Sequence, residues 1–260
     1  MQYFWEQSKL LEPIFRKANK IHLFLDFDGT LSPLVSTPAR AKLPKYTKIL
    51  LEQLVLIDNV TFAIISGRGL DDVKEKINIS GIFYSGSHGM EWELNGRRFA
   101  TTIPTKITLL LKEIKDAMIK ISQIYKGSHV EDKTFSVAFH YRRVAASKKV
   151  IIEELLHKQL SKYLETNLVS LLFSNETYEM RARLNWTKGD MVLHYKKLQH
   201  GNTSTIIYIG DSVTDEDAFK KLRRSITIKV GTRKAYIDNY FIINDRYVLS
   251  FLSCFIYVIS

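Results

Sequence analysis

The stretch Ile21-His22-Leu23-Phe24-Leu25-Asp26-Phe27-Asp28-Gly29-Thr30 decides the fold of this chain. Its first five residues form a near-continuous apolar run, which is typical of a strand buried on both faces of a parallel sheet. The run ends at two carboxylates and a glycine. Ligands of parallel α/β sheets bind beyond the carboxyl ends of the strands, so residues 26–30 are a candidate site.

Further apolar runs follow the same pattern and alternate with helical segments. The runs cover 60–65, 82–84, 205–209 and 226–230, and the first helical segments cover 4–19 and 45–57. Three of these runs end at polar or glycine-containing clusters, at Ser66-Gly67-Arg68, at Gly210-Asp211 and at Gly231. Strands that alternate with helices predict an α/β fold with a Rossmann-like, mostly parallel sheet.

The middle of the chain has a different order of elements. Here the predicted strands come in pairs, 128–133 with 134–143 and 168–173 with 178–183, after helices at 106–125 and 147–164. Paired strands favour an antiparallel sheet with helices on one face. We therefore expect a discontinuous core, residues 1–103 and 184–260, with an inserted smaller α+β domain at 104–183.

Composition narrows the class of protein. The 260 residues are 45% hydrophobic and 25% charged, which is enough for a sizeable core. The single cysteine, Cys254, excludes an internal disulfide and a cysteine-rich metal site. The net charge of +11 suits an anionic small molecule, nucleic acid or a membrane surface, but no run of five basic residues occurs. We expect neither a nucleic-acid nor a membrane partner.

The two ends of the chain bear on location. The first twenty residues lack the charged start, apolar middle and cleavage site of a signal peptide, so we expect a cytoplasmic protein. The apolar stretch 247–260 is shorter than the ~20 residues that span a bilayer. It predicts a buried terminal helix.

Four carboxylates, those of Asp26, Asp28, Asp211 and Asp215, follow two of the predicted strands. If the strands are neighbours, the carboxylates converge, and two unit charges ~4 Å apart repel by about 4 kcal/mol at an effective dielectric constant near 20. Such a cluster requires a cation. Oxygen ligands without His or Cys suit a hard ion, and magnesium is the usual one with phosphate substrates.

These residue types support phosphoryl transfer. Asp26 can attack phosphorus and form an aspartyl-phosphate, while Asp28 protonates the leaving oxygen and then activates water. Ser66 can donate to a phosphate oxygen, and Lys188 can supply the positive charge that a transferring phosphoryl group requires.

The same motifs resemble the haloacid dehalogenase superfamily. They are LDFDGTL at 25–31, the serine of SGR at 66–68, the lysine of WTKGD at 186–190 and GDSVTDED at 210–217. The strings SGRGLDDV (66–73), GSHGMEW (86–92), VEDKTFSVAFHYR (130–142) and YEMRARLNWTKG (178–189) are similar to trehalose-6-phosphate phosphatases. The resemblance implies magnesium-dependent hydrolysis of trehalose 6-phosphate in trehalose biosynthesis, with residues 104–183 as an α/β cap.

The resemblance also implies roles for individual residues. Asp26, Asp28 through its carbonyl, and Asp211 would ligate magnesium, with Asp215 in support. Ser66, Gly67 and Lys188 would bind the phosphoryl group. Substrate contacts would come from Arg68, His88, Glu131, Lys133, Arg142 and Glu179. The chain departs from the family pattern at Ser212, where an aspartate is usual, and at Ala182, where a proline is common.

Other functions remain open at this stage. A sucrose-phosphate or mannosyl-phosphoglycerate phosphatase shares the first motif, and a phosphomutase of the same capped branch would return the phosphoryl group. A regulatory or nucleic-acid-binding protein would use the net charge of +11 instead. We expect a monomeric enzyme that acts on a small sugar phosphate.

Overall fold

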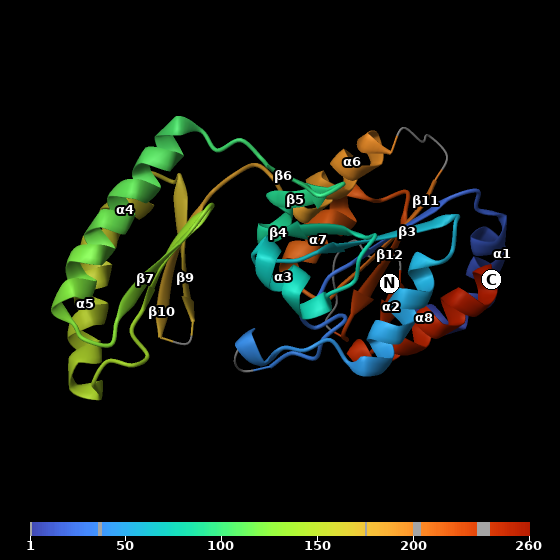
Figure 1. Cartoon of the computed structure of the whole chain (residues 1–260), viewed down its shortest axis with the longest axis horizontal. Coiled ribbons are helices and arrows are strands. Elements are labelled where there is room, and N and C mark those ends of the chain that lie inside the picture. Colours follow the sequence, from blue (N-terminus) through green and yellow to red (C-terminus); the bar gives the residue numbers. More distant parts are fainter. Residues whose placement is uncertain (1, 36–37, 175, 200–203, 233–239) are drawn as a thin grey trace. The chain divides into compact units, whose positions relative to one another are not determined.

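The apolar run that opens the candidate site forms strand β2 (Ile21–Leu25), and all five of its side chains are buried. The structure, a computed structural model, describes residues 2–35, 38–174, 176–199, 204–232 and 240–260. The chain divides into two compact units, one made of Met1–Thr101 with Trp186–Ser260 and one made of Thr102–Asn185. Figure 1 shows the course of the whole chain, coloured from the N-terminus in blue to the C-terminus in red.

The first unit is built on a mixed sheet. Its helices are α1 (Phe4–Lys17), η1 (Pro38–Arg40), α2 (Lys45–Val55), α3 (Leu70–Ile77), η2 (Ser87–Gly89), α6 (Lys188–Leu198), α7 (Val213–Lys221) and α8 (Asp245–Ile259). Its strands are β1 (Gln2–Tyr3), β2, β3 (Val60–Ile65), β4 (Phe83–Gly86), β5 (Glu91–Leu94), β6 (Arg97–Ala100), β11 (Thr205–Gly210), β12 (Ile226–Val230) and β13 (Tyr240–Ile242). Within the described residues, these nine strands have the order β1-β13-β12-β11-β2-β3-β4-β5-β6.

The sheet is parallel from β1 to β4, which confirms the predicted α/β class. Strands β5 and β6 continue it as an antiparallel hairpin, which the sequence reasoning missed. Helices α1, α2, α3 and α8 pack on one face, and α6 and α7 pack on the other. Alternate residues of β2 serve both faces, with Leu23 in one core and Phe24 in the other, so β2 lies in the middle of three layers.

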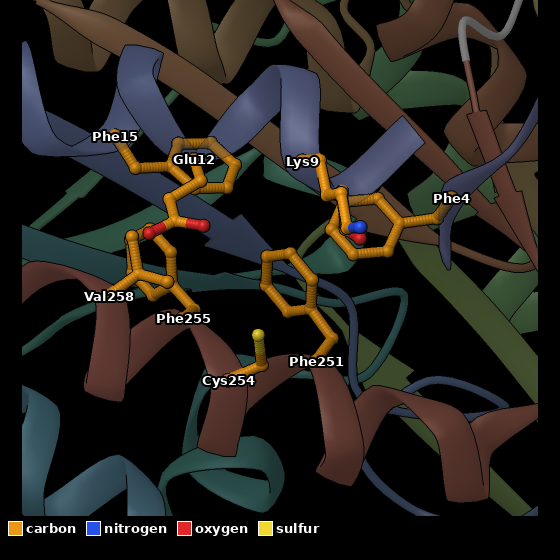
Figure 2. Close-up of a pocket in the computed structure, with 9 residues that line it drawn as sticks. Phe4, Lys9, Glu12, Phe15, Phe251, Cys254, Phe255 and Val258 are labelled. Carbon is orange, nitrogen blue, oxygen red and sulfur yellow. The ribbon is translucent and has the colours of Figure 1, made fainter. Parts of the chain in front are cut away.

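Helix α8 confirms the predicted terminal helix, although only one face is buried. Val248, Phe251, Leu252, Phe255 and Val258 face the core, while Tyr257 is exposed. Four phenylalanines of α1 and α8 surround a cavity of about 70 Å³ (Figure 2). None of the predicted site residues lines this cavity. No helix in the described ranges combines the length and the apolar character that crossing a bilayer demands.

The second unit is an antiparallel sheet with two helices. Its elements are α4 (Thr105–Ile124), β7 (His129–Lys133), β8 (Ser136–His140), α5 (Ala146–Leu164), β9 (Val169–Ser174) and β10 (Thr177–Ala182). The strand order is β7-β8-β10-β9, and all pairs are antiparallel. Every second side chain of the central strands packs against the helices. Val137, Phe139 and Met180 share one buried cluster with Ile114 of α4 and Leu156 of α5, so this unit has its own core.

Candidate active site

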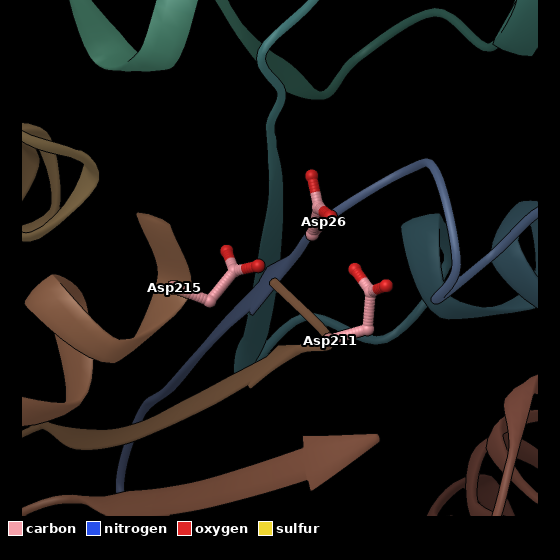
Figure 3. A group of neighbouring side chains, drawn as sticks. All are labelled: Asp26, Asp211 and Asp215. Atoms are coloured by element: carbon pink, nitrogen blue, oxygen red, sulfur yellow. The ribbon is translucent and has the colours of Figure 1, made fainter. Parts of the chain in front are cut away.

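Three carboxylates meet at the carboxyl ends of β2 and β11. The two strands pair in parallel with Leu25 opposite Ile209, so the residues that follow them lie side by side. Asp26, Asp211 and Asp215 each offer an oxygen, and these atoms lie within 4.8 Å of one another (Figure 3). The predicted convergence therefore holds for these three residues.

Lys188 is the cation at the centre of this cluster. Its side chain is 2% exposed, and Nζ donates to Asp26 Oδ1 and to Asp215 Oδ1, each at 2.8 Å. Lys188 is the first residue of α6, which begins at a capping box between Thr187 and Asp190. Burial disfavours the ammonium, but the two carboxylates outweigh this effect and raise the pKa of Lys188.

The charge on the cluster is not balanced by Lys188 alone. Burial, with Asp215 adding repulsion, raises the pKa of Asp211 to about 6. Burial also raises the pKa of Asp26, despite its bond to Lys188. Asp211 Oδ1 is buried, and no hydrogen-bond partner lies near it among the described residues. Three carboxylates around the Lys188 ammonium, with an orphaned oxygen on Asp211, fit a hard divalent cation.

Two glycines allow the carboxylates to approach so closely. A Cβ on Gly29, whose φ is +78°, would lie 2.1 Å from Asp211 Oδ2. A Cβ on Gly210 would lie 2.3 Å from Asp215 Cγ. Only a glycine can occupy either position without displacing a carboxylate.

The fourth predicted carboxylate, Asp28, does not join the cluster, so the expectation that four carboxylates converge was wrong. Arg68 holds Asp28 through two hydrogen bonds, from Nε to Oδ2 at 2.6 Å and from a terminal nitrogen to Oδ1 at 2.7 Å. The same guanidinium donates to Asp72 at 2.6 Å. A bidentate pair with arginine is geometrically specific, which explains why Asp28 turns toward Arg68.

Ser66 lies at the end of β3 in a loop that a second loop holds in place. Ser66 is fully buried, its Oγ accepts from the Arg68 amide at 3.2 Å, and its carbonyl accepts from the His88 amide at 2.8 Å. Ser87 and His88 both have left-handed backbone conformations, with φ of 49° and 59°. A Cβ on Gly67 would come within 2.6 Å of the His88 ring, so that ring packs on the backbone of Gly67.

Two residues outside the predicted set support this loop. Glu91 Oε1 accepts from Ser87 Oγ at 2.6 Å and from the Leu70 amide at 3.0 Å. Trp186 Nε1 donates to the Gly89 carbonyl at 2.7 Å. The histidine-glycine string contained Glu91, but the sequence alone did not indicate that the glutamate holds a loop.

In the second unit, three predicted substrate residues share the sheet face that is turned away from the helices. Lys133 Nζ lies 3.6 Å from Glu131 Oε2 and 3.6 Å from Glu179 Oε1. Burial opposes the charge of Glu179, but hydrogen bonds from Ser136 and Arg181 lower its pKa.

A histidine lies beside Glu131 on this face, and the remaining predicted residue, Arg142, lies in a nearby turn. His140 Nε2 lies 2.9 Å from Glu131 Oε2. Arg142 lies in the turn after β8 and is exposed, and the described hydrogen bonds and ion pairs do not join it to the other three.

The chain was also compared with known proteins. A family model described as trehalose-phosphatase matches residues 24–239. The chain is 30% identical over 219 residues to trehalose-phosphate phosphatase B of Arabidopsis thaliana, and 29% identical over 230 residues to probable trehalose-phosphate phosphatase G of the same plant. Each alignment covers 80% of this chain, but only 57% and 60% of those proteins, so the chain spans less than two thirds of their length.

Solved structures share the fold. The C-terminal domain of a Candida albicans trehalose-6-phosphate phosphatase superposes with a TM-score of 0.72 at 21% identity, over 97% of this chain and 98% of that one. An Aspergillus fumigatus trehalose-6-phosphate phosphatase gives a TM-score of 0.66 at 21% identity, over 99% of both chains. The family model covers most of the chain and includes Asp26, Lys188, Asp211 and Asp215, and on that match the chain belongs to the trehalose-phosphatase family.

Proposed function

We propose that this chain hydrolyses trehalose 6-phosphate to trehalose and phosphate through an aspartyl-phosphate on Asp26. The observation that carries the proposal is the buried Lys188 bound to both Asp26 and Asp215, with Asp211 beside them. The family and the printed names of the Arabidopsis relatives supply the substrate.

Asp26 is the proposed nucleophile. The bond from Lys188 to Oδ1 fixes the rotation of the carboxylate at the end of β2. Attack on phosphorus forms the Asp26–phosphate bond and breaks the bond to the sugar oxygen. Water then attacks the same phosphorus, which releases phosphate and restores the carboxylate. Lys188, Ser66 and the Gly67 backbone would hold the phosphoryl oxygens.

Asp28 is the proposed acid and base. It would protonate the leaving sugar oxygen and later take a proton from the attacking water. In the structure both of its oxygens accept from Arg68, so Asp28 must exchange this partner for the substrate oxygen. The resemblance implies a substrate contact for Arg68, and its hydrogen bonds to Asp28 support this proposal.

Magnesium is the proposed cation. Asp26, Asp211 and the Asp28 carbonyl would hold it, with Asp215 in support, and the unpartnered Asp211 Oδ1 and the oxygen-only donor set fit such an ion. When bound, magnesium neutralises negative charge on the phosphoryl group.

The sugar is proposed to bind in the second unit. The core would consist of residues 1–103 and 184–260 and the cap of 104–183. Glu131, Lys133 and Glu179 offer one cation and two anions on a single sheet face, a set that can hydrogen-bond several hydroxyl groups. Arg142 and, in the first unit, His88 are the remaining proposed contacts. The monomeric state and the cytoplasmic location stay predictions.

A phosphate-release panel tests the substrate. Trehalose 6-phosphate should be hydrolysed with a higher kcat/KM than sucrose 6-phosphate, glucose 6-phosphate or mannosyl phosphoglycerate. Equal rates on all four would overturn the sugar assignment, and isomer formation without phosphate release would indicate a mutase.

Asp26→Asn tests the nucleophile. The amide cannot form the acyl-phosphate, so turnover should fall to background, while the fold measured by circular dichroism should remain. Asp217→Asn, at a carboxylate paired with Lys220 on the surface of α7, is the matched control and should keep full activity. Normal turnover by Asp26→Asn would rule out the nucleophile.

A further inference from the structure

Lys229 is a buried cation that the proposed mechanism does not use. It lies in β12, a strand of sequence Ile-Thr-Ile-Lys-Val whose five residues are all buried, and it is only 3% exposed. Lysine is almost never fully buried unless it is paired, because the ammonium loses its hydration. Its position therefore requires specific partners.

Its partners lie in the loop between β11 and α7 and in the first turn of α7. Nζ donates to the Asp211 carbonyl at 2.5 Å and to the Ser212 carbonyl at 3.4 Å. Glu216 Oε1, in the first turns of α7, lies 3.6 Å from the same nitrogen. Lys229 thus links the neighbouring strand to the loop that carries Asp211.

The placement of this loop leaves little tolerance. Gly210 is opposite Lys229 in the sheet. Asp211 follows Gly210, and its carboxylate lies against Gly29, where an added Cβ would be 2.1 Å from Asp211 Oδ2. Ser212 is the N-cap residue of α7, and its amide donates to Asp215 Oδ2 at 2.9 Å. A small shift of the Asp211 backbone would move this carboxylate away from Asp26 and Asp215.

We propose that Lys229 is a positioning residue for the metal site: by holding the carbonyls of Asp211 and Ser212, it places Asp211 to bind the divalent cation. The inference rests on the proposed function only through the metal site. It does not depend on which sugar phosphate is hydrolysed.

The charge and the position of Lys229 predict opposite effects on metal affinity. A second ammonium near the carboxylates repels an incoming cation, so its removal would strengthen binding if charge alone mattered. If Lys229 acts by holding the loop, its removal weakens binding, because groups that orient metal ligands contribute 10–100-fold in affinity by order of magnitude. The sign of the change separates the two roles.

The experiment uses Lys229→Met, which keeps an apolar stem of similar length and removes the ammonium. The first readout is the MgCl₂ concentration that raises the Tm of the whole chain by a fixed amount in the absence of substrate. The second is the MgCl₂ concentration for half-maximal phosphate release at saturating substrate. We expect both MgCl₂ concentrations to rise by about 10-fold or more, with the KM for substrate unchanged.

Lys220→Met is the matched control, because it removes the same charge from the exposed surface of α7. It should leave both concentrations unchanged. If the two MgCl₂ concentrations stay unchanged or fall in Lys229→Met, the inference is overturned. If Lys229→Met does not fold, Glu216→Gln removes one partner of the ammonium and should raise the same concentrations, and no rise would overturn it.

The two proposals fail in different ways. A wild-type chain that MgCl₂ stabilises through Lys229 but that releases no phosphate would keep this inference and overturn the proposed function. A wild-type chain that hydrolyses the substrate with no response of either readout to MgCl₂ would overturn this inference.

Discussion

At the scale of single residues, Gly29 and Gly96 form a natural matched pair. Their φ angles are +78° and +73°, but a Cβ on Gly29 would lie 2.1 Å from Asp211 Oδ2, whereas a Cβ on Gly96 would meet nothing within 4 Å. An alanine at either position carries the same left-handed strain of about 1–2 kcal/mol. Only Gly29→Ala also displaces a carboxylate.

We therefore expect Gly29→Ala to reduce phosphate release by about 100-fold, as small displacements of reacting groups do. It should also lose the stabilisation by MgCl₂. Gly96→Ala should keep both properties, with a similar small loss of stability. Equal activity of the two variants would show that the contact between Gly29 and Asp211 has no functional weight.

The residues of the site differ in how far the sequence could predict them. Asp26 and Asp211 were predictable, because each ends an apolar run and parallel neighbouring strands end at one edge. The partner of Asp28 was not, because Arg68 reaches it across 40 positions of sequence by side-chain conformation alone. Lys229 gave a signal that was overlooked, a lone lysine within a buried apolar strand.

At the scale of elements, a histidine links β2 to its neighbour β3. His22 is 1% exposed, its Nδ1 lies 2.6 Å from Thr61 Oγ1, and its ring packs edge-on against Tyr195 of α6 at 5.5 Å. Burial, with Lys20 and Lys196 adding repulsion, lowers the pKa of His22 from 6.5 to about 4. The folded state therefore holds this imidazole neutral while the unfolded chain takes up a proton.

This difference predicts a specific acid sensitivity. The contribution of His22 to stability is fully present above pH 6.5 and is lost as the pH falls through about 4, a loss of about 3 kcal/mol. Urea unfolding should show this fall in the wild type and a flatter profile in His22→Gln. His157→Gln, at an exposed position of α5, should keep the wild-type profile. Parallel profiles for all three proteins would contradict the assignment.

The elements themselves were predictable to different degrees. Strands β2, β3 and β12 begin and end where the apolar runs do. The hairpin of β5 and β6 was missed, although Asn95 and Gly96 both have positive φ and form the Asn-Gly turn that favours such hairpins. The hairpin could not be predicted from apolar alternation, because the four residues of β6 are all exposed and do not alternate between apolar and polar.

At the scale of the whole molecule, the two units have separate cores. Leu156 of α5 belongs to the core of the second unit and Leu252 of α8 to that of the first, and both are fully buried. All three tryptophans of the chain, Trp5, Trp92 and Trp186, lie in the first unit. Tryptophan fluorescence therefore reports the unfolding of the first unit, while circular dichroism reports both.

This arrangement predicts that equivalent core mutations have separable effects. Leu156→Ala and Leu252→Ala each remove a buried leucine side chain, which costs about 2–5 kcal/mol. Leu156→Ala should lower the stability seen by circular dichroism and leave the fluorescence transition in place. Leu252→Ala should move the fluorescence transition to lower urea. The carboxylate cluster and Lys188 lie in the first unit. MgCl₂ should therefore raise the urea midpoint of the fluorescence transition by the same amount in Leu156→Ala as in the wild type. A fluorescence transition that shifts equally in both leucine variants would instead mean that the two cores unfold as one cooperative unit.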